Sequence, residues 1–206
     1  MSSSPSYLDP IILPLVNGET VLDVGCGYGR WGSLLETNFF ESGLKKPPQI
    51  DGLDAFQPNV DFCSRKSCYS RVWQQVMPSP LKGKWDIVLA CEIIEHVDQR
   101  QLDELMDILE GAAKKRVILT TPNWPYYRDG GETLVGWNDY EAHLSYVSRD
   151  YFKKRGYKVI GAGFGNPKLR IVGLIKRFAD FLTPALESLP RLLPFLGESI
   201  VVYKDM

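Results

Sequence analysis

Val21-Leu22-Asp23-Val24-Gly25-Cys26-Gly27-Tyr28-Gly29 is the stretch that decides the fold of this 206-residue chain. Its first half is largely apolar, which is typical of a strand that is covered on both faces in a parallel sheet. Its second half carries a glycine at every other position, and a helical pattern follows over 30–40. Glycine lets the backbone turn tightly and brings amide groups close to a ligand. The stretch therefore predicts a nucleotide-like pocket at the carboxyl end of a buried strand.

The glycine turn is compatible with two kinds of ligand. Residues 27–32 spell Gly-x-Gly-x-x-Gly, the dinucleotide fingerprint, and Asp54 lies 22 residues beyond its last glycine. Asp23, however, stands just before the turn, where a carboxylate would repel a pyrophosphate and attract a cationic ligand. Asp23 therefore favours a ligand with positive charge over a dinucleotide.

The overall composition is that of an ordinary globular protein and predicts one domain over 1–206. A net charge of −1 gives no broad attraction to nucleic acid. The four cysteines lack CxxC spacing, so we expect reduced thiols and a cytoplasmic protein. The sequence shows neither a signal-peptide pattern nor an uncharged apolar stretch long enough to span a membrane.

Beyond the first strand and helix, the chain alternates between strand-like and helix-like patterns. Three segments stand outside this alternation: an N-terminal arm over 1–17, an aromatic-rich lid over 124–146, and a helical insertion over 166–197. Such an insertion before the last strand would let that strand return antiparallel. Further strands are expected over 49–53, 71–76, 85–91, 116–121, 156–164 and 198–204, with amphipathic helices from Asp98 and over 148–155.

The combined motifs resemble the class I S-adenosylmethionine (SAM)-dependent methyltransferases over roughly residues 18–164. The resemblance rests on Asp23 with the glycine turn, on Asp54, and on the blocks over 86–97 and 117–123. It implies an α/β, Rossmann-like fold with a seven-stranded, mostly parallel sheet in the order 3-2-1-4-5-7-6. It also implies that SAM is the cofactor and lies across the ends of strands one, two and four.

The same resemblance implies a role for each residue near the cofactor. The turn would wrap the methionine end, Asp54 would hold the ribose hydroxyls, and Glu92 would border the methyl group. Many relatives carry an acid that meets the adenine amine; this chain offers Gln75 instead. The expected cofactor-binding residues are Asp23, Gly25, Gly27, Gly29, Asp54, Gln75 and Glu92.

The two histidines of the chain, His96 and His143, both fall in candidate site segments and are the candidate catalytic residues. His143 is a hypothetical general base for the acceptor, or alternatively a residue that hydrogen-bonds the lid to the body. Glu92, Glu95 and His96 stand at i, i+3 and i+4 and share one face if the segment is helical.

With His143, these residues would offer two carboxylates and two imidazoles to a divalent cation such as Mg²⁺. This Glu-x-x-Glu-His pattern with a distant histidine is similar to that of the magnesium-dependent RNA 3′-end 2′-O-methyltransferases. Its first part is also similar to ubiquinone-pathway O-methyltransferases. The alternative is that Glu95 and His96 only pack and cap the helix that follows.

We expect methyl transfer to a small-molecule acceptor, at a hydroxyl oxygen rather than at nitrogen or carbon. The alternatives are a metal-dependent RNA 2′-O-methyltransferase, a non-catalytic SAM-binding protein and a dinucleotide oxidoreductase. Nucleic acid is disfavoured as a partner by the near-neutral charge. The insertion over 166–197 is expected to be a packing element or homodimer face, a cover for a hydrophobic acceptor, or a peripheral membrane contact.

Overall fold

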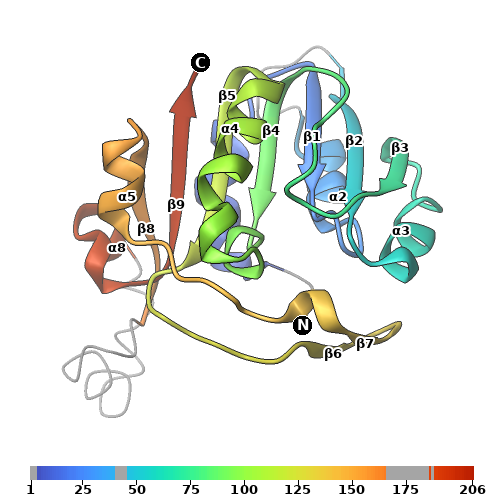
Figure 1. The fold of residues 1–206 in the computed structure, drawn as a ribbon. Helices are drawn as coiled ribbons and strands as arrows, with labels where there is room; N and C mark the ends of the chain where they lie inside the picture. The colour runs from blue at the N-terminus through green and yellow to red at the C-terminus, as the bar shows by residue number, and fades with distance from the viewer. Residues whose placement is uncertain (1–3, 40–45, 166–185, 187) are drawn as a thin grey trace.

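A computed structural model describes residues 4–39, 46–165, 186 and 188–206 (Figure 1). Its main sheet has seven strands in the order β3-β2-β1-β4-β5-β9-β8. Strands β1 to β5 run parallel to one another, and β9 runs antiparallel to both β5 and β8. The predicted order 3-2-1-4-5-7-6 with a reversed last strand is therefore confirmed. The strands are β1 (Thr20–Val24), β2 (Gln49–Asp54), β3 (Tyr69–Gln74), β4 (Trp85–Cys91), β5 (Ala113–Pro122), β8 (Lys158–Phe164) and β9 (Gly197–Asp205).

Helices cover both faces of this sheet because alternate strand residues point to opposite sides. Leu22 faces the same core as α4 (Leu102–Ala112) and α5 (Arg149–Lys154). Its neighbour Val21 faces the other core, with the N-terminal helices. Those helices are α1 (Asp9–Ile12), α2 (Arg30–Thr37) and α3 (Gln57–Cys63). The strands are thus buried on both faces, as their apolar sequences predicted.

The helix α4 shows how sequence spacing becomes packing. Its apolar residues recur at i, i+3, i+4 and i+7 and are all buried: Leu102, Leu105, Met106 and Leu109. Asp98, predicted to start this helix, instead caps a 3-10 turn over Gln99–Gln101 by accepting a hydrogen bond from the Arg100 amide. The regular helix begins only after that turn.

The lid over 124–146 is more ordered than the sequence indicated. It contains a two-stranded hairpin, β6 (Gly131–Thr133) with β7 (Gly136–Asn138), and a 3-10 turn over Asp139–Glu141. Figure 1 shows the lid passing below the main sheet, at the edge where the arrows of β1 and β4 end. The N-terminal arm reaches the same edge, so the segment before β1 and the segment after β5 meet at the carboxyl ends of the parallel strands.

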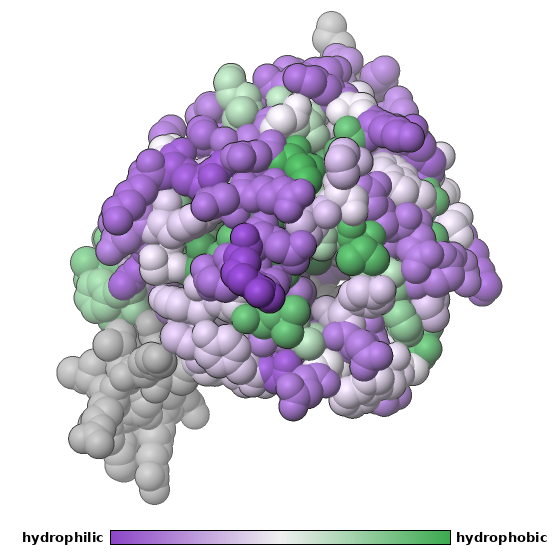
Figure 2. All heavy atoms as spheres, viewed as in Figure 1, coloured by the Kyte–Doolittle hydropathy of each residue, from purple (hydrophilic) through white to green (hydrophobic). Residues whose placement is uncertain are grey.

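Most of the predicted insertion over 166–197 lies outside the described residues. The predictions that it forms a homodimer face, an acceptor cover or a membrane contact therefore also lie outside them. Its described end carries a short helix, α8 (Leu189–Leu192), and a 3-10 turn over Pro194–Leu196. Among the described residues, no helix is long and apolar enough to cross a membrane. The face seen in Figure 2 is mainly hydrophilic, with hydrophobic side chains in small separate groups.

Candidate cofactor and acceptor site

A cavity of about 410 Å³ opens at the carboxyl ends of β1, β2 and β4. Its size is typical of small-molecule sites. The glycine turn and the ends of β2 and β4 form one side, and the lid and the N-terminal arm form the other. The position is where open parallel sheets bind ligands.

The glycine turn forms the wall nearest to β1. Its backbone is fixed by two amides, of Gly25 and Cys26, which both donate to the Leu53 carbonyl at 2.7 and 2.9 Å. Gly25 has a φ of +72°, and a Cβ at this position would overlap the Cδ1 atom of Ile93. Only glycine fits there without strain, so the turn keeps bare backbone at the cavity. Gly25 and Gly27 line the cavity as predicted, whereas Gly29 does not belong to its lining.

Asp23 lies behind the turn rather than in the cavity wall. Its residue is 1% exposed, and its Oδ2 accepts a 2.6 Å hydrogen bond from the Tyr69 hydroxyl. Its Oδ1 is buried and has no hydrogen-bond partner among the described residues. Burial raises the pKa of Asp23 to about 7, although the Tyr69 bond opposes the shift. Asp23 is therefore not among the residues that line the cavity, and its predicted contact with a cationic ligand stays a prediction.

Tyr69 was not singled out from the sequence, yet it links three elements. From β3 it reaches across Gly52 of β2 to Asp23 on β1, and its hydroxyl accepts the Gly32 amide of α2 at 3.1 Å. A Cβ at Gly32 would overlap the tyrosine ring, so this glycine leaves room for that contact. The third glycine of the apparent dinucleotide fingerprint thus packs against a side chain. No spacing rule in the sequence marks this contact.

Asp54 and Gln75 both line the cavity. Asp54 accepts hydrogen bonds from the amides of Gly27 and Phe56, each at 2.9 Å, and so joins the end of β2 to the glycine turn. Burial raises the pKa of Asp54. Gln75 donates to the Ser79 carbonyl at 3.0 Å and accepts from Trp73, so its side chain is held by its own loop. The ribose and adenine roles of these two residues stay predictions.

Two glutamates follow β4 in very different settings. Glu92 lines the cavity with a φ of +56°, and its Oε1 accepts a 2.8 Å hydrogen bond from the Thr120 hydroxyl. Burial raises the pKa of Glu92 to about 7. Glu95 is 2% exposed, and neither of its carboxylate oxygens has a hydrogen-bond partner among the described residues. Burial, and then the Glu92 carboxylate, hold the pKa of Glu95 well above its usual range.

His96 and His143 lie edge to face, with ring centroids 4.8 Å apart. The Nδ1 atom of His96 is 2.9 Å from the Ala142 carbonyl oxygen, and that of His143 is 3.0 Å from the Tyr126 carbonyl oxygen. Because a carbonyl only accepts, each Nδ1 carries the proton and each Nε2 keeps a free lone pair. Burial lowers the pKa of both histidines to about 4, so both rings are neutral at pH 7.

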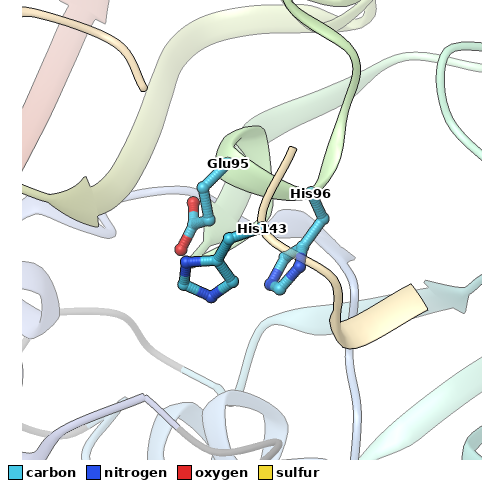
Figure 3. A group of neighbouring side chains, drawn as sticks. All are labelled: Glu95, His96 and His143. Carbon is cyan, nitrogen blue, oxygen red and sulfur yellow. The ribbon is translucent and has the colours of Figure 1, made fainter. Parts of the chain in front are cut away.

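Figure 3 shows Glu95, His96 and His143 side by side, with the carboxylate directed towards the His143 ring. Each offers a ligand atom within 4.8 Å of those of the other two. Glu92, which the sequence placed in the same metal set, lies outside this group. The reason is local: the backbone from Glu92 is left-handed and then forms a 3-10 turn over Ile94–His96, so the expected helical face does not form.

The N-terminal arm completes the cavity. Tyr7 lines it, and the Tyr7 hydroxyl lies 3.0 Å from the Ser199 hydroxyl of β9. Asp9 forms an ion pair with Arg30 at 2.7 Å, which ties the arm to α2. Leu8 and Ile12 are fully buried in the core. The arm therefore both lines the cavity and packs into the core.

The observed features fit SAM. Because position 25 is a glycine, a ligand can approach the backbone of the turn closely. A cavity of suitable size lies across the ends of the three expected strands. Gly25, Gly27, Asp54 and Glu92 would line the bound cofactor. Fold and cavity together define a class I SAM-dependent methyltransferase.

Comparison with known proteins supports this class. A family model described as a methyltransferase domain matches residues 6–161. No curated protein matches the sequence. Among solved structures, a SAM-dependent methyltransferase from Archaeoglobus fulgidus has a TM-score of 0.61 at 18% identity, covering 98% of this chain and 92% of that one.

Two further structures share the fold. The DhpI–SAM–HEP complex has a TM-score of 0.59 at 12% identity, with 96% and 86% of the two chains covered. Magnesium protoporphyrin IX methyltransferase from Synechocystis PCC 6803, with bound S-adenosylhomocysteine (SAH), has a TM-score of 0.53 at 14% identity, with 97% and 78% covered. The chain belongs to the methyltransferase-domain family, and it is an enzyme that uses SAM as methyl donor. This assignment sets aside a dinucleotide oxidoreductase and a non-catalytic binding protein.

Proposed function

We propose that the enzyme methylates a hydroxyl oxygen of a small-molecule acceptor, and that a divalent cation bound by Glu95, His96 and His143 assists the transfer. The single observation that carries the proposal is the cluster of two neutral imidazoles beside the buried Glu95 carboxylate, with one ligand atom of each residue within 4.8 Å of those of the other two. A bound cation of this kind lowers the pKa of an oxygen that it coordinates.

The histidine pair is prepared for metal binding by its hydrogen bonds. A metal-binding histidine usually donates its other ring nitrogen to a carbonyl or carboxylate, which fixes the tautomer. His96 and His143 both do so through backbone carbonyls. Neither ring has to lose a proton at pH 7 before Nε2 can coordinate, because burial keeps both neutral.

Glu95 supports the same site because burial without a cation holds its pKa well above its usual range, whereas a bound cation would stabilise the ionised carboxylate. The carboxylate oxygens of Glu95 have almost no surface that a water molecule can reach, but a cation without its hydration shell is smaller than a water molecule. Ligand bonds of about 2.1 Å require ligand atoms roughly 3 Å apart. The three ligand atoms, which lie within 4.8 Å of one another, must therefore draw closer together. Two imidazoles with one carboxylate suit Zn²⁺, Fe²⁺ or Mn²⁺ better than Mg²⁺.

The surroundings of the cluster support a small acceptor with a flat ring or sugar face. Trp124 and Tyr126 line the cavity and pack on one another with centroids 5.0 Å apart. Tyr126 in turn lies edge-on to His143 at 5.1 Å. Aromatic walls of this kind bind planar groups. Magnesium protoporphyrin IX methyltransferase, which shares the fold, acts on a flat macrocycle by its name.

An oxygen acceptor is favoured because a neutral hydroxyl is a poor nucleophile that must lose its proton. An amine with a free lone pair needs no such help. A site with two neutral imidazoles and the Glu92 carboxylate, whose pKa is about 7, is equipped to receive that proton. His143 as a metal-free general base remains the alternative for the same residues. An RNA acceptor is disfavoured because the net charge of −1 provides no general attraction to phosphates.

The test measures metal content and methyl transfer together. Purified enzyme should contain, or take up, close to one divalent cation per chain, and H96Q and H143Q should each lose most of it. Radiolabelled methyl transfer to a panel of phenols, catechols and sugars should fall strongly after chelation and return with Mn²⁺ or Zn²⁺. E132Q, at an exposed lid residue on β6, is the control and should keep both metal and activity.

Undiminished turnover after complete chelation would reject the metal and leave His143 as the base. Transfer only to amines or carbon acids would reject the hydroxyl acceptor.

A further inference from the structure

Arg30 stands where the glycine turn becomes helix α2, and it forms part of the cavity wall. Its Nη2 atom donates to both carboxylate oxygens of Asp9 at 2.7 Å. Its Cζ atom lies 4.9 Å from the ring centroid of Trp31. The guanidinium is thus held on two sides by the arm and by the helix.

The Nη1 atom of the same guanidinium is buried and has no hydrogen-bond partner among the described residues. A buried donor without a partner is costly, and the cost is greater for a charged group. A guanidinium prefers an anionic, planar partner such as a carboxylate. The unpaired Nη1 can therefore donate to a hydrogen-bond acceptor of a ligand.

The described cavity wall contains only two arginines and no lysine. Arg128, at the lid, is already engaged: it donates to the Glu141 carboxylate at 2.6 Å and to the Glu141 carbonyl at 2.8 Å. The two histidines are neutral at pH 7. Arg30 is consequently the cation available to a negatively charged ligand group beside the glycine turn.

We propose that Arg30 binds the carboxylate of the methionyl part of SAM through Nη1, and that Asp9 is a positioning residue that holds the other side of the guanidinium. The methionyl part bears the one carboxylate of SAM. Seating that carboxylate requires the guanidinium to turn towards the cavity while Asp9 keeps Nη2. The inference depends on cofactor binding alone and is independent of the metal and of the acceptor.

The test compares two ligands that differ in that carboxylate. SAH retains it, whereas S-adenosyl-3-thiopropylamine, the decarboxylated analogue, has the same sulfur, adenosine and amine without it. Isothermal titration should show that the wild type binds SAH about 10- to 100-fold more tightly, the worth of one charge-assisted hydrogen bond. Equal affinities for the two ligands in the wild type would overturn the proposal without any variant.

Three variants then assign the preference to Arg30. R30Q should bring the two affinities within about threefold of one another, mainly by weakening SAH. D9N breaks the same ion pair from the other side but keeps the guanidinium, so it should retain most of the preference. R100Q, at an exposed arginine that pairs with Asp98, should behave as the wild type.

A merely structural role predicts a different pattern. If Arg30 only fastened the arm, R30Q and D9N would weaken both ligands equally, and that result would overturn the proposal. Thermal unfolding without ligand checks that each variant is folded. Should R30Q be unfolded, R30K takes its place: the preference for SAH should fall, because an ammonium has no second nitrogen that Asp9 can hold while the first binds the carboxylate. A full wild-type preference in R30K would count against the proposed contact through Nη1.

Discussion

Replacing Asp23 by Asn should change how the stability of the enzyme depends on pH. Asp23 is buried behind the glycine turn, where one oxygen accepts the Tyr69 hydroxyl and the other has no partner. Burial raises its pKa from 3.8 to about 7. Asparagine has nearly the same shape and can accept the same hydrogen bond, but it does not ionise. The substitution therefore isolates the cost of the buried charge.

The sign follows from proton binding in the two states. Between pH 4 and 7 the folded enzyme holds a proton on Asp23 that the unfolded chain has released, so stability falls as pH rises. A shift of about three pKa units corresponds to about 4 kcal/mol at pH values above both pKa values. Over pH 5 to 8 the linkage gives a change of about 2.5 kcal/mol. D23N should gain that amount relative to the wild type across this range.

Urea unfolding of both proteins at pH 5, 6, 7 and 8 measures this gain, with tryptophan fluorescence and circular dichroism as probes. D86N is the control. Burial opposes ionisation of Asp86, but hydrogen bonds from the Glu19 amide and Lys115 outweigh it and lower its pKa. Asp86 is therefore ionised in both states above pH 5, and its difference from the wild type should be flat. A flat difference for D23N would refute the account of a buried, proton-holding carboxylate.

Four further substitutions test the packing around the site and in the core. Gly25→Ala should weaken SAH binding roughly tenfold or more, because its φ of +72° disfavours other residues and its Cβ would overlap Ile93. Ile93→Ala in the same chain should restore part of that affinity, whereas no recovery would exclude the steric contribution. Tyr69→Phe should raise the Kd for SAH and leave the KM of the acceptor unchanged, because it removes the hydroxyl that accepts a hydrogen bond from the Gly32 amide. A change in the KM of the acceptor without a change in the Kd for SAH would contradict this. Phe152→Ala should lower the free energy of unfolding by about 3–5 kcal/mol without affecting the Kd for SAH of the folded protein.

The fold could be predicted from the sequence because its signals are local. The strands β1 and β4 are short apolar runs between turns, and the helix α4 repeats its apolar residues at helical spacing. The hairpin of β6 and β7 escaped prediction because three-residue strands are too short to show an alternating pattern. The third strand was placed two residues late because Tyr69 precedes the apparent apolar run.

The site was predictable only in part, because side-chain direction depends on the neighbouring strands. Asp54 and Glu92 line the cavity, as expected for residues at the carboxyl ends of their strands. The same reasoning predicted that Asp23 would line the cavity. Successive residues of a strand point to opposite faces, however, and Asp23 points into the buried layer behind the turn. Its partner Tyr69 comes from two strands away, and the glycines that admit the ring could not be told apart from ligand-binding glycines.

The histidine pair shows what the backbone adds to a motif. Glu95 and His96 are adjacent in sequence, but His143 reaches them only because the lid is bonded to their turn. The Glu95 carbonyl accepts the amides of Leu144 and Ser145 at 2.8 and 3.1 Å. The carbonyl of Ala142, one residue before His143, in turn accepts the proton of His96. Each histidine is thus oriented by main-chain groups of the lid, and the spacing of the Glu-x-x-Glu-His motif alone could not have predicted this arrangement.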